Sequence, residues 1–208
     1  MSDICPTVTA FDTHEYRVQI ERLEPFAERI HIDMMDGKFT TTISPNLDQI
    51  WWPLKLTADI HLMYQNPMDH IHQLIHLKPN LVVIHAEASL QHQQFTARLH
   101  DSGIKAGIAL LHETQVDSIK NSILCYDHVL IFSGDLGKHG GLANLSLLQK
   151  VTEIRNIHPD AEISWDGGIN DTNAAKLIDG GVSVLNVGGY IQKSQNPQEA
   201  YAKLKAIT

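Results

Sequence analysis

The chain has 208 residues, 43% of them hydrophobic and 19% charged, with a formal net charge of −8. This length suits one domain with a substantial core. The negative charge, without any cluster of Lys and Arg, excludes a protein that binds nucleic acid. No run of residues is long and apolar enough to cross a membrane. Because Cys5 and Cys125 lie far apart and no signal peptide is visible, the sequence predicts a reduced, cytoplasmic protein.

Short β-prone runs alternate with segments of helical apolar spacing from one end of the chain to the other. In chain order, the sequence predicts a strand at Ile4–Val8, a helix at Tyr16–Phe26, strands at Arg29–Asp33 and Leu56–Leu62, a helix at Met68–Leu77, strands at Leu81–His85, Lys105–Leu111 and His128–Phe132, a helix at Leu145–Ile157, a strand at Glu162–Trp165, a helix at Ala174–Ile178 and a strand at Val184–Val187. Strands that alternate with helices indicate a parallel sheet.

Several helix boundaries carry their own signals. Asp171 and Thr172 are expected to cap the helix that follows them, and Gly180 with Gly181 is expected to end it. The Asn-Pro pairs at 66–67 and 196–197 should each begin a helix, because proline is tolerated at the first helical position.

Eight predicted strands with helices between them, and no linker or low-complexity segment, predict a (β/α)₈ barrel formed by residues 1–208 as a single domain. A doubly wound open sheet is the structural alternative. It is less favoured, because no GxGxxG follows the first predicted strand.

Four polar residues fall at the ends of three predicted strands. His31 and Asp33 are two residues apart and therefore point to the same face, whereas His61 and Asp166 end strands elsewhere in the chain. In a barrel the carboxyl ends of all strands meet at one mouth, so the four side chains should converge there. Two imidazoles and two carboxylates can hold a divalent metal, and two carboxylates can also act on opposite faces of one carbon.

These residues lie in longer motifs whose order and spacing can be compared with known families. The motifs are Cys5-Pro6-Thr7, His31-Ile32-Asp33-Met34-Met35-Asp36-Gly37, Asp59-Ile60-His61-Leu62-Met63, His85-Ala86-Glu87-Ala88-Ser89, Asp166-Gly167-Gly168 and Val187-Gly188-Gly189. Together they resemble the ribulose-phosphate 3-epimerase family along nearly the whole chain. The resemblance implies a TIM-barrel enzyme that inverts a hydroxyl-bearing carbon beside the ketone of a phosphorylated sugar.

The resemblance also implies a divalent metal held by His31, Asp33, His61 and Asp166. A proton beside a ketone is too weakly acidic to remove unless the enediolate is stabilised, and a metal supplies that stabilisation. Epimerisation then needs one base on each face of the carbon, the expected catalytic roles of Asp33 and Asp166. The ligand types suit Zn²⁺, Fe²⁺, Co²⁺ and Mn²⁺ alike.

Further residues are expected to bind the substrate. Thr7 offers a hydroxyl where the family usually has serine, and Met35 and Met63 would form an apolar floor that excludes water. Glycines allow backbone N–H groups to approach a phosphate closely. The expected glycines are Gly140, Gly141, Gly167, Gly168, Gly188 and Gly189.

The chain departs from the family pattern around the expected phosphate site. Residues 135–141 replace the family's Pro-Gly-Phe-Gly-Gly loop, and residues 38–42 lack its proline-asparagine pair. Gly189 and Phe132 stand where a serine and a third methionine are usual. In the changed loop, Lys138 and His139 either contact the anion or face solvent; the sequence favours neither.

Three functions follow from these observations. The first is 3-epimerisation of D-ribulose 5-phosphate to D-xylulose 5-phosphate, and the second is the same chemistry on another ketose phosphate such as allulose 6-phosphate. The third is a non-catalytic barrel that binds a sugar phosphate, which the retention of all four candidate ligands disfavours. The related decarboxylases carry a lysine array that is absent from residues 31–36. The resemblance further suggests a homo-oligomer.

Overall fold

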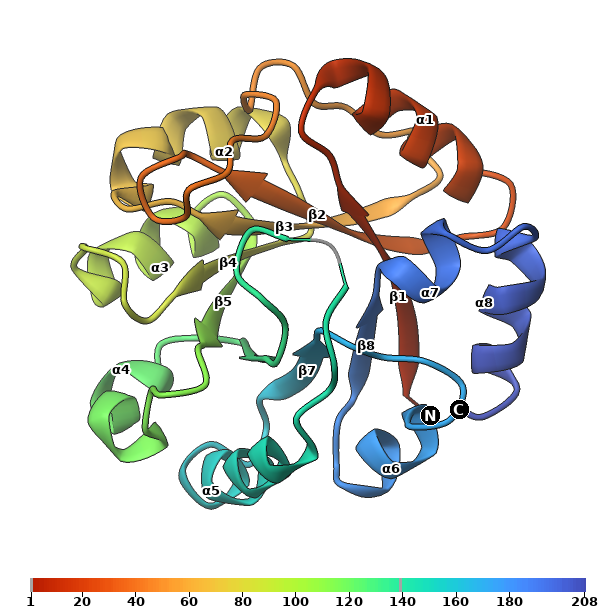
Figure 1. Ribbon diagram of the computed structural model, residues 1–208. Helices are drawn as coiled ribbons and strands as arrows, with labels where there is room; N and C mark the ends of the chain where they lie inside the picture. The colour runs from red at the N-terminus through yellow and green to blue at the C-terminus, as the bar shows by residue number, and fades with distance from the viewer. Residues whose placement is uncertain (1, 139) are drawn as a thin grey trace.

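The computed structural model describes residues 2–138 and 140–208, and in them eight parallel strands close into a barrel (Figure 1). Each strand pairs with its neighbours in sequence, and β1 (Asp3–Thr9) closes the circle by pairing with β8 (Val184–Val187). This closure confirms the predicted (β/α)₈ barrel. It excludes the open-sheet alternative, in which the edge strands would remain unpaired.

The predicted strands all form, with ends that shift by at most two residues. The other strands are β2 (Arg29–Met35), β3 (Thr57–Met63), β4 (Leu81–His85), β5 (Lys105–Leu110), β6 (His128–Phe132) and β7 (Glu162–Asp166). The helices are α1 (Thr13–Leu23), α2 (Ile71–Leu77), α3 (His92–His100), α4 (Lys120–Ile123), α5 (Gln149–Ile157), α6 (Ala174–Asp179), α7 (Gly189–Gln192) and α8 (Pro197–Lys205). Short 3-10 turns precede α2, α4 and α5.

The start of α1 and the cap of α6 differ from the sequence prediction, and 3-10 turns form the beginnings of the helices predicted from Met68 and Leu145. Helix α1 begins three residues early, because the Asp12 side chain accepts a hydrogen bond from Glu15 N at 2.8 Å and caps it. The prediction that Asp171 or Thr172 caps α6 is wrong, since Asn173 occupies the N-cap position. Thr172 instead donates to the Asn170 side chain in the preceding turn.

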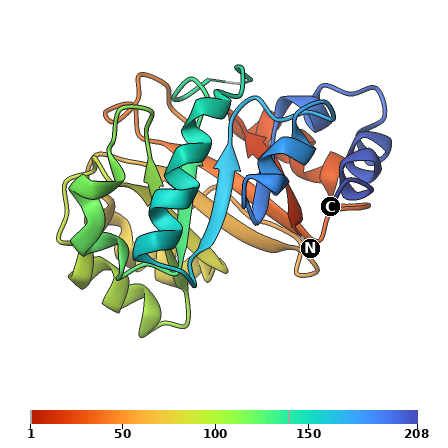
Figure 2. The ribbon, with the colours of Figure 1, turned by 90° about the horizontal axis from the view of Figure 1, so that it is seen from below.

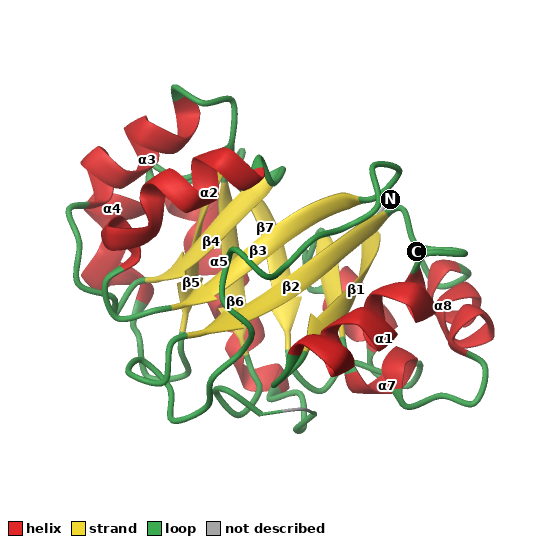
Figure 3. Cartoon of the chain, turned by 90° about the horizontal axis from the view of Figure 1, so that it is seen from above, coloured by secondary structure: helices red, strands yellow, loops and turns green. Residues whose placement is uncertain are grey.

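Side chains alternate between the outer and inner faces of each strand, and this alternation separates an apolar layer outside the barrel from one inside it. Helices flank the strands in Figure 3, whereas a loop without a helix connects β2 to β3. Outward-facing residues such as Ile30, Ile32 and Met34 belong to the large core outside the strands. Inward-facing residues of β4 to β6, among them Val83 and Leu130, form a smaller cluster inside the barrel. The inward positions of β2 and β3 near the mouth carry polar side chains instead.

Charged side chains fill the barrel at its amino-terminal end. Arg29 donates to Asp59 at 2.6 Å and to both oxygens of Glu162 at 3.1 and 2.9 Å, and His128 Nδ1 lies 2.8 Å from the same Glu162 carboxylate. Burial by itself raises the pKa of Glu162, but the hydrogen bonds from His128 and Arg29 outweigh it and hold that pKa well below 4.5. The network therefore ties β2, β3, β6 and β7 together.

The loops that follow the strands lie at the opposite, carboxyl-terminal end of the barrel. Figure 2 shows the loop after β6 at this end, the end toward which the strands run. Within residues 2–138 and 140–208, the helices are too short or too polar to span a bilayer.

The charged network predicts a pH-dependent stability. At pH 7 we expect Glu162→Gln to lower the free energy of unfolding by about 1–2 kcal/mol, because Arg29 and His128 lose a charged partner. A depressed pKa makes this contribution present above the unfolded value near 4.5 and lost as the pH falls further. Urea unfolding at pH 7 and pH 3 should show the difference from wild type shrinking at the lower pH.

Glu21→Gln is the matched control, because Glu21 pairs with Arg17 on the exposed face of α1. A Glu162→Gln protein that is as stable as wild type at pH 7, or one whose deficit grows on acidification, would contradict this account.

Candidate metal centre

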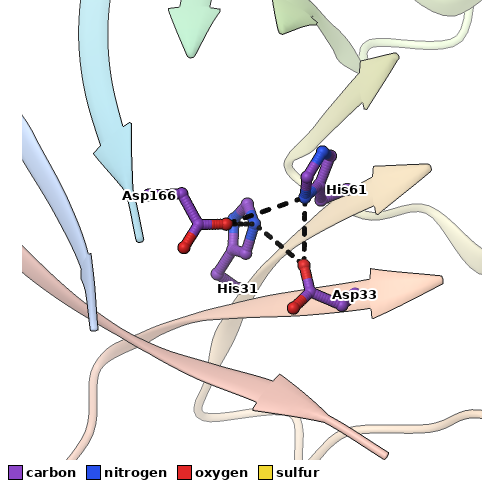
Figure 4. A group of neighbouring side chains, drawn as sticks. All are labelled: His31, Asp33, His61 and Asp166. Carbon is purple, nitrogen blue, oxygen red and sulfur yellow. Dashed lines mark hydrogen bonds and ion pairs between the residues drawn. The ribbon is translucent and has the colours of Figure 1, made fainter. Parts of the chain in front are cut away.

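Strand pairing brings the four candidate ligands together. In the β2–β3 register Asp33 lies opposite His61, and His31 precedes Asp33 by two residues on the same face of β2. Asp166 ends β7 on another part of the barrel wall. Figure 4 shows the four side chains converging on one point inside the mouth.

The facing atoms are close enough to share one ion. His61 Nδ1 lies 3.0 Å from Asp33 Oδ1 and 3.8 Å from Asp166 Oδ2. His31 Nε2 lies 3.4 and 3.6 Å from the same two oxygens. One donor atom from each of the four residues lies within 4.8 Å of every other, and all four residues are buried. A cation among them would contact all four.

An unpartnered nitrogen supports this interpretation. His31 Nε2 is buried and has no hydrogen-bond partner among the described residues. Leaving a buried polar atom unsatisfied costs about 1–3 kcal/mol, whereas a divalent cation would accept its lone pair. Mixed imidazole and carboxylate donors are ligands that first-row transition metals accept. The residues therefore fit a divalent metal ion.

Asp33 is oriented by a residue that the sequence analysis did not single out. Thr9 Oγ1 donates to Asp33 Oδ2 at 2.7 Å, which leaves Oδ1 directed toward the two histidines. Thr9 pairs with Asp33 in the β1–β2 register and follows Thr7 by two residues on the same face. The two-residue spacing between Thr7 and Thr9 is the feature of the sequence that could have indicated a role for Thr9.

The two carboxyl groups have opposite pKa shifts. Burial alone would raise the pKa of Asp33, but the neighbouring imidazoles of His31, 3.4 Å away, and His61, 3.0 Å away, outweigh it and keep that pKa far below its usual 3.8. Burial, and then the nearby Asp33 carboxylate, raise the pKa of Asp166 to about 7. Burial is also the largest cause that lowers the pKa of His61 to about 4, so its imidazole is neutral at pH 7. In the metal-free protein one carboxyl is thus ionised while the other readily holds a proton.

A cavity of about 310 Å³ opens beside the four residues. It is lined by most of the residues expected to bind substrate, namely Thr7, Met63, Gly140, Gly141, Gly167, Gly168, Gly188 and Gly189, together with Asp33 and Asp166. Met35 is not among the described lining residues. It is buried, and its sulfur accepts a hydrogen bond from Thr42 at 3.1 Å.

Lys138 and Lys193 also line the cavity, and Lys193 was not considered from the sequence. Both side chains belong to exposed residues. His139, the other cationic candidate of this loop, lies outside the described residues.

The glycine turns at the mouth differ in how closely other atoms surround them. At Gly167, with φ of 109°, a Cβ would lie 2.2 Å from Gly134 N, so glycine there lets the loop after β6 pack against β7. At Gly189 the nearest atom to a Cβ would be 3.9 Å away. The missing serine side chain therefore leaves open space at the edge of the cavity rather than a crowded contact.

The two loops that depart from the family pattern touch each other. Thr42 Oγ1 donates to the carbonyl of Gly137 at 2.9 Å, which joins the loop after β2 to the loop after β6. The two changed loops thus contact each other, and the described cavity lining includes residues of the loop after β6.

Comparison with solved structures shows the fold. The structure of 3-hexulose-6-phosphate synthase from Salmonella typhimurium superposes with a TM-score of 0.73 at 12% identity, covering 100% of this chain and 98% of that one. The structure of KGPDC from Streptococcus mutans superposes with a TM-score of 0.74 at 10% identity, covering 99% of this chain and 96% of that one.

Comparison with curated sequences shows the family. The ribulose-phosphate 3-epimerase of Helicobacter pylori is 28% identical over 98% of this chain and 97% of its own length, and that of Schizosaccharomyces pombe is 27% identical over 97% and 92%. The model of the ribulose-phosphate 3 epimerase family matches residues 3–192. The chain therefore belongs to the ribulose-phosphate 3-epimerase family, and it is an isomerase of the epimerase class.

Proposed function

We propose that the protein is a metal-dependent 3-epimerase that interconverts D-ribulose 5-phosphate and D-xylulose 5-phosphate. The observation that carries this proposal is the pair Asp33 and Asp166, which share one buried metal-type cluster and both line the cavity beside it. Family membership supports the reaction class, and the names of the curated relatives support the substrate.

The two carboxyl groups supply the proton transfers. We assign them to opposite faces of C-3, because they project from β2 and β7 on different parts of the barrel wall. The ionised carboxylate removes the proton from C-3 and the protonated carboxyl returns one on the other face, which inverts the carbon. The opposite pKa shifts of Asp33 and Asp166 support such a division of roles. For the reverse reaction the roles exchange.

His31 and His61 would hold the metal ion together with the two aspartates, through Nε2 and Nδ1 respectively. The bound cation supplies positive charge beside the oxygens of the enediolate. The donor set is compatible with Zn²⁺, Fe²⁺, Co²⁺ and Mn²⁺.

Other cavity residues can bind the rest of the sugar phosphate. Thr7 Oγ1 is buried, lines the cavity and has no hydrogen-bond partner among the described residues, so a substrate hydroxyl can satisfy it. We place the phosphate between the Gly167-Gly168 and Gly188-Gly189 turns, because all four glycines line the cavity and a backbone without Cβ can bring its N–H groups close to an anion. Lys138 and Lys193 at the rim add positive charge on that side.

Solvent-deuterium exchange tests the proposal directly. The metal-loaded protein would be incubated in D₂O with ribulose 5-phosphate and, separately, with allulose 6-phosphate, and followed by NMR. Deuterium at C-3 together with xylulose 5-phosphate formation is the expected result. Exchange on the six-carbon sugar alone would replace the proposed substrate, and exchange on neither would favour a binding-only barrel.

Removal of either carboxylate should stop the reaction. We expect Asp33→Asn and Asp166→Asn each to lower kcat at least about 10³-fold, because one face of the carbon loses its proton carrier. Asp171→Asn, in the exposed turn before α6, is the control and should retain full activity. Turnover near the wild-type rate in either variant would refute the two-base mechanism.

The metal requirement should be reversible. Dialysis against a chelator is expected to abolish epimerisation, and addition of one equivalent of Zn²⁺, Co²⁺, Mn²⁺ or Fe²⁺ under anaerobic conditions should restore it. The preferred ion is the one that restores the highest kcat. Full activity in protein shown by elemental analysis to be metal-free would exclude the metal.

A further inference from the structure

We propose that Glu87, which is not one of the four candidate ligands, positions the metal ligand His61 by fixing the tautomers of two hydrogen-bonded imidazoles, those of His85 and His61. The inference rests on the proposed metal site. It assigns a role to His85 and Glu87, and these residues contribute to the centre only through His61.

The two nitrogens of His61 face different partners. Nδ1 is directed at the cluster, 3.0 Å from Asp33 Oδ1, whereas Nε2 lies 2.9 Å from Nε2 of His85. Both imidazole side chains are completely buried. His85 is thus the hydrogen-bond partner of the ring nitrogen that points away from the metal site.

Hydrogen-bond chemistry then fixes where the protons must be. A neutral imidazole carries one N–H and one lone pair, and a metal ligand must present the lone pair. If Nδ1 of His61 binds the ion, its proton is on Nε2 and is donated to His85. His85 must accept at Nε2, and its own proton must therefore be on Nδ1.

Glu87 provides the reason for His85 to adopt that tautomer. Its carboxylate oxygen Oε2 lies 3.5 Å from His85 Nδ1, and that nitrogen has no hydrogen-bond partner among the described residues. An N–H facing a carboxylate is attracted to it, whereas a lone pair at the same place is repelled. The negative charge of Glu87 therefore selects the tautomer of His85, which selects that of His61.

The carboxylate of Glu87 is itself held in place. The Thr114 hydroxyl donates to Oε1, and the backbone N–H of Leu111 lies 3.4 Å from the same oxygen. The buried ammonium of Lys150 donates to the carbonyls of Leu111, His112 and Thr114 at 2.7, 3.0 and 2.9 Å. Lys150 thereby anchors the segment after β5 that fixes Glu87.

Aromatic rings cover the histidine pair. The Phe39 ring lies 4.8 Å from that of His85, and the Phe132 ring lies 5.9 Å from both imidazoles. These apolar neighbours offer no competing hydrogen bonds to the two rings. The tautomers consequently depend on the polar chain from Asp33 through His61 and His85 to Glu87.

Two measurements test the relay. Long-range ¹H–¹⁵N NMR of histidine-labelled, Zn²⁺-loaded wild type should show the proton on Nε2 of His61 and on Nδ1 of His85, because the ion takes the place of a proton on His61 Nδ1 beside Asp33. In Glu87→Gln, which keeps the shape but removes the charge, we expect mixed tautomers and Zn²⁺ affinity about 10-fold weaker in competition with a fluorescent chelator. Glu87→Asp, which keeps the charge, should restore most of the affinity.

Asp127→Asn is the matched control, because Asp127 pairs with His100 at 2.8 Å on the outer surface. It should leave Zn²⁺ affinity unchanged. Wild-type tautomers opposite to those expected, or wild-type affinity in a folded Glu87→Gln protein, would overturn the inference. A wild type that shows the expected tautomers and binds Zn²⁺ but epimerises neither sugar would contradict the proposed reaction while supporting the relay.

Discussion

The parallel register of β2 and β3 places Asp33 beside His61, and the polar contacts of the candidate centre are built on that pairing. Side chains alternate between the two faces of a strand, so a slip of one residue would turn His61 out of the barrel and into the apolar layer. Closure of the barrel restrains such a slip, because each strand is paired on both sides. The same closure brings Asp166 of β7 to within reach of β2.

Burial then gives these polar groups their reactivity. In water, Asp33 and Asp166 would have nearly the same pKa. Inside the mouth they differ, because two imidazoles lie beside Asp33 and stabilise its ionised form, whereas burial and then the Asp33 charge raise the pKa of Asp166. The packing that forms the barrel thereby gives the two carboxyl groups opposite pKa shifts. A bound cation would be held by the same atoms, which links metal binding to the protonation of both groups.

Local sequence patterns predicted most of the fold and the four candidate ligands. The β-prone runs marked every strand, because strands buried on both sides read as continuous apolar segments. The four ligands followed from motifs at strand ends. Contacts between distant segments could not be predicted from local patterns. The hydrogen bond from Thr9 to Asp33 depends on the register in which β1 pairs with β2. The hydrogen bonds from Lys150 to the segment after β5 depend on where α5 packs against the barrel. The start of α6 at Ala174 was predicted correctly, but its cap was not, because Asn170 and Asn173 form the hydrogen bonds of the preceding turn.

Anomalous diffraction from crystals grown with Co²⁺ or Zn²⁺ tests the central claim most directly. The account predicts one strong anomalous peak, bonded to His31 Nε2, His61 Nδ1 and an oxygen of each of Asp33 and Asp166, at metal–ligand distances of about 2.0–2.2 Å. A peak elsewhere on the protein, or none at the barrel mouth with the metal in excess, would contradict it.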